Sequence, residues 1–361
     1  MRRMGYLGLT LLLTLGLAIP AVSQQGAQAK TAAEYNAYKA FYDEQNPQKK
    51  AELGEKFLAD YKESDFIPQG YQLLISAYAR GQNWAKVMEA TDRATALPKA
   101  DNKLKAYAYE NAMVAGQQAN NFEKLVEYGD KLLAVDPNNL NAMIQLSSML
   151  PERLPQDEAA KKAALEKART FATKAMGGVQ QIFSQPKPAN FTDAQWAQEK
   201  ANLEGQLNAT LAFISLNMAS IEPAEAAKQH YAKAIEEYDI ALKSIPKDGV
   251  ARFRLGLAYQ FQAAEASKVL LEAINAENAA KTARADQAQI DELDAKRQGL
   301  EADAAMKRDK AIDELAKAVA LGGVVAQPAR EQLEKLYKVK NNDSLTGLDQ
   351  LIAQKKTELG Q

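Results

Sequence analysis

Apolar residues recur along most of the chain at the three- and four-residue spacings of amphipathic helices. Tyr35, Tyr38 and Tyr42 fall on one face of a predicted helix. Pro47 breaks that pattern, and a second helix of the same kind follows it. Two short helices joined by a tight turn form a hairpin, in which each helix buries its apolar stripe on the other. The first residues of the pattern therefore predict a helical hairpin.

The same hairpin pattern returns several times, with large apolar residues at matching places and small residues such as Gly256 where the two helices of a hairpin are expected to cross closely. The residues that carry the pattern are Tyr71, Leu74 and Tyr78; Tyr109, Ala112, Phe122 and Leu125; Met143, Leu146 and Leu150; Tyr231, Ala234, Tyr238 and Pro246; Leu255, Gly256 and Tyr259; and Ala311, Leu315 and Ala318. This pattern resembles the 34-residue tetratricopeptide repeat. The resemblance implies an all-α fold, an α-solenoid of helix-turn-helix hairpins, because one repeat cannot bury its own apolar face.

Five segments follow from the pattern and its interruptions. Gly177-Gly178 predicts a helix end, Thr192 with Gln195 predicts a capping box that opens a long helix, and Ser344 predicts the N-terminal cap of the last helix. A polar, Ala-rich stretch predicts a long helical insertion that projects as an antiparallel arm and turns between Asn275 and Asp286. We expect a signal peptide over 1–23, N-terminal repeats over 24–178, a loop over 179–190, C-terminal repeats over 191–323 with the insertion at 262–306, and capping helices over 324–361.

The first residues have the character of an export signal. Arg2 and Arg3 precede a short apolar run, and Ala21-Val22-Ser23 offers small residues for cleavage before Gln24. Ala27-Gln28-Ala29 is a second candidate cleavage site, and an uncleaved membrane anchor is the alternative interpretation. Removal of residues 1–23 changes the formal charge from −1 to −3. The sequence thus predicts a periplasmic or secreted protein.

Composition narrows the chemistry that is available. The chain has no cysteine, which excludes disulfides and thiolate catalysis, and its one histidine, His230, leaves a multi-histidine metal site or a serine triad nearly out of reach. Its charge is close to balanced, which predicts no nucleic-acid partner. Carboxylates such as Asp291-Glu292 lie among lysines, as on solvated helix faces. We therefore expect no catalytic, cofactor or metal residues.

Function then depends on surface shape. In the tetratricopeptide family the first helix of each repeat lines a groove that binds extended or helical peptides. The resemblance implies a candidate groove at Gln72, Ser76, Arg80, Glu110, Val114, Gln117, Ile144, Ser148, Phe253, Leu257 and Phe261. The last three form an apolar patch that suits a partner protein, another copy of the chain or the adjacent arm.

Two functional hypotheses remain open at this stage. The first is a non-catalytic scaffold that binds protein partners in the cell envelope. The spacing from Phe57 through Tyr61 and Ser64 to Phe66 supports it, because it is similar to repeats of bacterial envelope proteins. The alternative is a small-ligand-binding protein or a carboxylate-dependent enzyme built on the same helices. Several carboxylates converging in a deep pocket would favour the alternative, and a long open groove would favour the scaffold.

Overall fold

The computed structural model describes residues 27–98 and 100–360, so the expected signal peptide lies outside the described residues. These residues form an all-α fold, with no strand among them. The helices are α1 (Ala32–Asp43), α2 (Pro47–Asp60), α3 (Ile67–Arg80), α4 (Trp84–Thr95), α5 (Asn102–Gln118), α6 (Phe122–Val135), α7 (Leu140–Met149), the 3₁₀ turn η1 (Leu150–Glu152), α8 (Glu158–Ser184), α9 (Asp193–Ala219), α10 (Ala224–Ser244), α11 (Gly249–Thr282), α12 (Gln287–Leu321), α13 (Ala326–Lys340) and α14 (Leu348–Glu358).

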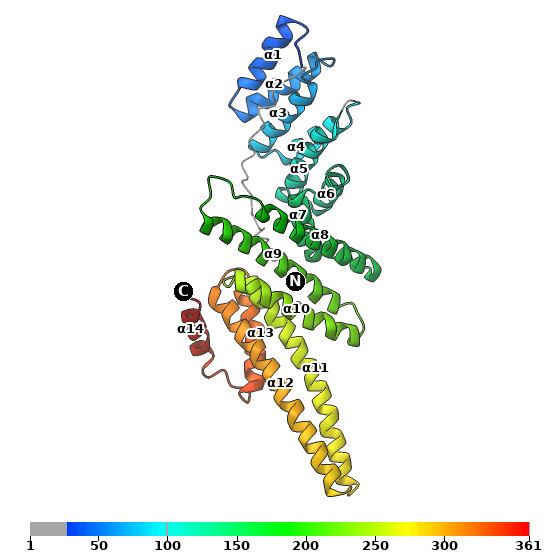
Figure 1. The fold of residues 1–361 in the computed structure, drawn as a ribbon, viewed down its shortest axis with the longest axis vertical. Coiled ribbons are helices and arrows are strands. Elements are labelled where there is room, and N and C mark those ends of the chain that lie inside the picture. The colour runs from blue at the N-terminus through cyan, green and yellow to red at the C-terminus, as the bar shows by residue number, and fades with distance from the viewer. Residues whose placement is uncertain (1–26, 99, 361) are drawn as a thin grey trace. The chain divides into compact units, whose positions relative to one another are not determined.

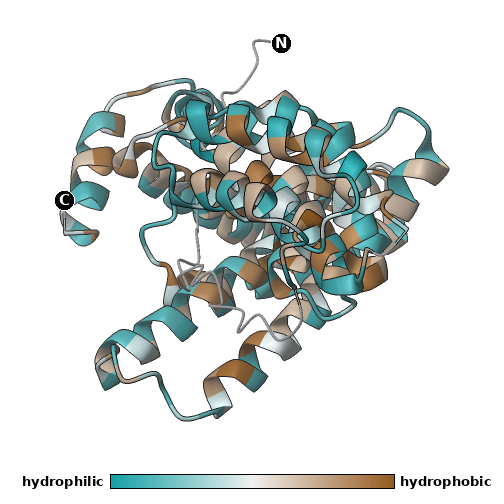
Figure 2. Cartoon of the chain, turned by 90° about the horizontal axis from the view of Figure 1, so that it is seen from above, coloured by the Kyte–Doolittle hydropathy of each residue, from teal (hydrophilic) through white to brown (hydrophobic). Residues whose placement is uncertain are grey.

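Consecutive helices pair as antiparallel hairpins, and the chain divides into two compact units (Figure 1). The N-terminal unit holds the described residues up to Leu146, and the C-terminal unit begins at Ser147, so α7 spans the boundary. Polar and apolar residues alternate around the helices of both units (Figure 2). No helix of the described part is both long and apolar enough to cross a membrane.

The N-terminal unit repeats one hairpin turn. An asparagine caps the second helix of each of its hairpins, at Asn46, Asn83 and Asn121. Each of these side chains accepts a hydrogen bond from the backbone N–H of a lysine three residues later. The residue before two of them, Gln82 and Asn120, has the same left-handed φ, 54° and 55°. The unit is therefore a true repeat of helix, turn and helix.

Side-chain packing then joins these hairpins. Each helix contacts the next one along the chain, and α3 also contacts α5. Gly116 of α5 crosses α6 so closely that a Cβ there would lie 2.7 Å from the backbone nitrogen of Leu125. The core under the first hairpins is rich in aromatic rings, and Tyr38 and Phe66 stack with their centroids 4.3 Å apart.

In the C-terminal unit, hydrogen bonds among three side chains join α8, α9 and α10. The Arg169 guanidinium of α8 donates to Glu237 of α10 at 3.1 Å and to Ser215 of α9 at 2.5 Å. The Ser215 hydroxyl donates in turn to Glu237 at 2.6 Å. Ser215 and Glu237 are both buried, so the closed set of bonds satisfies groups that water cannot reach.

The structure corrects two expected helix ends. Helix α8 does not stop at Gly177-Gly178 but continues to Ser184, so the first part of the expected 179–190 loop is helical. The extra turns bring Phe183 to within 4.2 Å, centroid to centroid, of Trp196 on α9, and this burial outweighs the cost of helical glycine. Ser344 does not cap α14. Its hydroxyl accepts a bond from the N–H of Thr346, and Gly347, with φ 88°, precedes the helix.

The long helical insertion is confirmed. Helices α11 and α12 extend beyond their neighbours as an antiparallel arm and turn at residues 283–286, within the expected interval. The capping box at Thr192 and Gln195 and the helix that runs from it to Ala219 are also confirmed. Ala263, Ala266 and Ala273 are buried along α11 and let the two backbones of the arm lie close together.

Candidate protein-binding surface

The first helices of two hairpins in the N-terminal unit lie against each other. Helix α3 contacts α5, and the Tyr107 hydroxyl of α5 donates to the backbone carbonyl of Gln72 on α3 at 3.2 Å. Tyr107 also interacts with the Ser76 side chain, and burial raises the pKa of its phenol. The structure thus brings Gln72 and Ser76 to one surface with Tyr107, which the sequence analysis did not single out.

A second polar contact continues this surface toward α7. The Asn141 side-chain amide donates to Glu110 Oε1 of α5 at 3.2 Å. Asn141 lies 31 residues after Glu110, and Tyr107 lies 35 residues after Gln72. Both separations are close to one repeat length. A search of the sequence for polar residues about one repeat apart could therefore have found these two contacts.

The other predicted groove residues of α3 and α5 lie further along these two helices. Arg80 is exposed at the end of α3, and its charge acts on Tyr107. Burial, and after it the charge of Arg80, lowers the pKa of Lys50. Val114 and Gln117 are half-buried on α5. We call the set formed by Gln72, Ser76, Arg80, Tyr107, Glu110, Val114, Gln117 and Asn141 the α3–α5–α7 surface.

The expected positions on α7 fall in different units. Ile144 and Ser148 are both half-buried on α7, and the boundary between the two units falls between them, after Leu146.

The structure does not bring the three expected positions of α11 together on one open face. Phe253 packs against the cluster that α12, α13 and α14 form around Leu315 and Leu333. Phe261 is 46% exposed and stacks on Tyr231 of α10 with ring centroids 5.2 Å apart. Leu257 is half-buried between them along the helix. Phe253 is therefore a packing residue of the C-terminal helices.

Carboxylates do converge at one place in the C-terminal unit, beside α10, α11 and α12. Glu314 pairs with Arg252 at 2.6 Å, Asp313 with Lys355 at 2.7 Å, and Asp309 with Lys340 at 3.0 Å. These ion pairs link α11, α13 and α14 to α12, so they act in packing. No group of three possible metal ligands occurs in the described part of the chain.

His230 is half-buried on α10, and burial lowers its pKa. The charges that act on it include those of Glu222 and Arg169. His230 therefore lies near charged residues that form ion pairs in the α8–α10 region, which are the surroundings of a packing histidine.

No protein-family model matches the chain, and no curated protein matches it. Among solved structures, the chain is similar to a tetratricopeptide repeat protein from Parabacteroides merdae, at 11% sequence identity and a TM-score of 0.42, over 85% of this chain and 99% of that chain. The assignment of an all-α fold follows from the helices of this chain and their contacts, and does not use this similarity.

Proposed function

We propose that the chain is an exported, non-catalytic scaffold of tetratricopeptide type that binds a protein or peptide partner in the cell envelope. The observation that supports this most directly is the α3–α5–α7 surface, where α3 packs against α5 and the Asn141 side chain of α7 bonds to Glu110 of α5. Such a row presents side chains from different repeats to one elongated ligand.

The chemistry of the α3–α5–α7 surface suits a peptide. The side-chain amides of Gln72 and Gln117 can bond to the backbone of an extended chain, which carries one donor and one acceptor per residue. Arg80 and Glu110 offer opposite charges on neighbouring helices, and the half-buried Val114, one helical turn after Glu110, offers an apolar contact. A partner with a mixed polar and charged segment fits this arrangement.

A photo-crosslinking experiment tests the binding surface. A photoreactive residue at Gln72 or Gln117 should trap the same partner in cells, and one at Glu123, exposed on α6, should not. Arg80→Glu should reduce that capture, while Lys103→Glu, an exposed lysine at the start of α5, should leave it unchanged. Equal capture from Glu123 would contradict the assignment of the surface.

Export is tested separately by the mature N-terminus. We expect mass spectrometry of the native protein to find Gln24 as the first residue and fractionation to find the protein in the periplasm. A chain that retains residues 1–23 in the membrane would support the anchor interpretation and contradict cleavage.

A further inference from the structure

The single histidine of the chain lies at the contact between α8 and α10. Along α8, Lys162 and then Arg169 form ion pairs with Glu222 and Glu237, which follow each other in the same order, so α8 and α10 run parallel there. His230 lies seven residues before Glu237 on α10, and therefore on the same face of that helix. Arg169 and Glu237 are 68 residues apart, and so are Lys162 and His230. This common register brings the charge of Lys162 near the imidazole.

The start of α8 is held mainly by Glu222, in the turn before α10. The Glu222 carboxylate pairs with Lys162 at 2.8 Å, and the charge of Glu166, one turn later on α8, also acts on Lys162. Leu165 is the first buried residue of α8. Within the described part of the chain, the pair with Glu222 is the one ion pair that residues 158–164 make. Opening of this helix end therefore depends on a single contact.

Cations outnumber acids among the charged groups that act on His230. Lys162 and Arg169 of α8 and Lys233 of α10 act on it, and Glu222 is the acid that opposes them. Burial, and after it these cations, lowers the pKa of His230 below its ordinary 6.5. A positive charge on the imidazole is therefore unfavourable while α8 stays in place.

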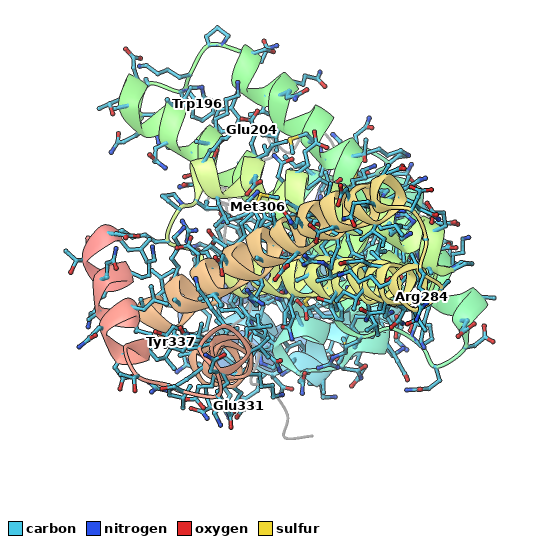
Figure 3. The ribbon with its side chains drawn as sticks, turned by 90° about the horizontal axis from the view of Figure 1, so that it is seen from below. Trp196, Glu204, Arg284, Met306, Glu331 and Tyr337 are labelled. Atoms are coloured by element: carbon cyan, nitrogen blue, oxygen red, sulfur yellow. The ribbon has the colours of Figure 1, made fainter. Side chains whose placement is uncertain are left out.

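The other helices packed against α10 leave this balance unchanged. Helix α9 has no titratable side chain after Glu204, whose position Figure 3 marks. On α11, Glu265 and Lys268 carry opposite charges and act on Tyr231, which stacks on a ring of α11. The positive surroundings of His230 thus come from α8 and from α10 itself.

We propose that His230 makes the contact of α8 with α10 an acid-sensitive latch. While the imidazole is neutral, Lys162 holds Glu222 and the latch is closed. When the imidazole takes up a proton, it attracts Glu222 and repels Lys162, so residues 158–165 are released. The Arg169–Glu237 pair keeps the rest of α8 in place. The latch rests neither on export nor on the α3–α5–α7 surface.

The pH range follows from linkage between proton uptake and opening. Since the pKa of His230 in the closed latch is below 6.5, the closed form binds a proton more weakly than the open form does. The stability of the latch is therefore complete above about pH 6.5 and is lost as the pH falls through the pKa of the closed form. Glu222 stays ionised in this range, because its hydrogen bond with Lys162 lowers its pKa from 4.5.

Hydrogen exchange of the full mature chain tests the latch. Rates are compared as protection factors, which remove the intrinsic effect of pH on exchange. Residues 158–165 should lose protection between about pH 7.5 and about pH 5.5, whereas α9 and α10 should keep it. His230→Gln, which stays neutral, should keep the protection at both pH values, and Glu222→Gln should lose it at both. Circular dichroism at the higher pH should show that both variants keep their helices.

The protonation of His230 can be followed on its own, because the chain has one histidine and hence one set of imidazole signals in nuclear magnetic resonance. Titration should give a pKa below 6.5. Lys162→Met should raise this pKa, because it removes a repelling cation and frees Glu222. Lys174→Met, at an exposed lysine further along α8, should leave it unchanged.

Four results would overturn the proposal. They are protection of residues 158–165 that does not change with pH, an equal loss of protection in His230→Gln, a His230 pKa at or above 6.5, and an equal acid-induced loss in α9 and α10. The last would mean that acid unfolds this part of the unit instead of releasing the start of α8.

Discussion

Gly256 of α11 lies where the base of the arm is tightest. A Cβ at this position would be 2.7 Å from Cγ of Leu315 and 3.3 Å from its backbone nitrogen. The sequence analysis had placed small residues such as Gly256 at helix crossings, and the distances confirm this for Gly256. Gly177 of α8 is the opposite case, because nothing lies within 4 Å of a Cβ there.

These two glycines give paired predictions. Gly256→Leu should lower the free energy of unfolding by about 1–3 kcal/mol, because the added side chain overpacks the crossing. Gly177→Ala should raise it by about 0.5–1 kcal/mol, because alanine loses less conformational freedom in a helix. Urea unfolding followed by circular dichroism measures both. A stabilising Gly256→Leu would mean that the two helices separate there in solution.

Glu34 is a buried carboxylate that holds the start of the first hairpin. It accepts a hydrogen bond from the Ser64 hydroxyl at 2.5 Å and another from the backbone N–H of Lys30 at 2.6 Å. The hydrogen bond from Ser64, with those from the backbone, lowers the pKa of Glu34 below its ordinary 4.5, against the opposing effect of burial. The ionised form is therefore favoured in the folded protein.

Acid should therefore weaken the first hairpin. Since the folded pKa of Glu34 is the lower one, its contribution is complete above about pH 4.5 and is lost as the pH falls through the folded value. Glu34→Gln should lower the melting temperature at pH 7 and reduce its further decline toward pH 3. Glu123→Gln, at an exposed carboxylate of α6, should follow the wild type. An undiminished decline in Glu34→Gln would assign the acid sensitivity elsewhere.

At the scale of elements, the two aromatic residues of α11 have different roles. Phe253 contributes to the cluster of α12, α13 and α14, whereas Phe261 lies against a single ring at the surface. Phe253→Ala should therefore cost about 2 kcal/mol of unfolding free energy, somewhat less than for a fully buried phenylalanine. Phe261→Ala should cost about 0.5–1 kcal/mol. Thermal melts of the two single variants test this, and equal losses would contradict the difference in packing.

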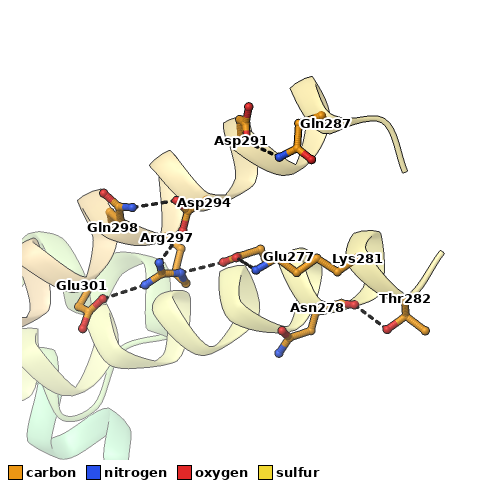
Figure 4. A network of polar contacts seen from close by, with 10 residues as sticks. All are labelled: Glu277, Asn278, Lys281, Thr282, Gln287, Asp291, Asp294, Arg297, Gln298 and Glu301. Carbon is orange, nitrogen blue, oxygen red and sulfur yellow. Dashed lines mark hydrogen bonds and ion pairs between the residues drawn. The ribbon is translucent and has the colours of Figure 1, made fainter. Parts of the chain in front are cut away.

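The arm depends on one cluster of charges as well as on its alanines. Arg297 of α12 donates to Glu277 of α11 at 2.7 Å, and on its own helix to Asp294 at 2.5 Å and Glu301 at 2.9 Å (Figure 4). Lys281 also pairs with Glu277. A buried acid held from both helices favours one alignment of the arm over others shifted along it.

Removal of this contact should loosen the distal arm only. We expect Arg297→Met to speed amide hydrogen exchange over residues 266–300 and to leave α3, α5 and α9 unchanged, because local opening depends on local contacts. Lys296→Met, at an exposed neighbouring position, is the control. Unchanged exchange in the arm would mean that the alanine packing suffices alone.

At the scale of the whole molecule, neither a disulfide nor a metal held by cysteines or by several histidines is available to join helices, because the chain has no cysteine and one histidine. Its stability should therefore depend on helix packing. We expect a helix-dominated circular dichroism spectrum and a melting temperature that neither reductant nor chelator changes. A shift with chelator would indicate a bound metal.

The sequence by itself determined the all-α fold, the hairpins, the arm and the crossing at Gly256. Each of these follows from spacing along a single helix or between adjacent helices, which the order of residues records directly. The asparagine caps are also local features of the sequence, because each cap bonds to a backbone N–H three residues later. The sequence analysis did not use them.

Only the tertiary structure decided which helix faces are covered. The sequence placed Phe253 and Phe261 together because they are eight residues apart, but neighbouring helices from other parts of the chain separate their roles. The contact of Tyr107 with Gln72, the continuation of α8 to Phe183, and the ion pairs of α8 with Glu222 and Glu237 likewise need the packed helices. Periodicity shows that a face is apolar or polar, whereas contacts between distant segments determine what that face meets.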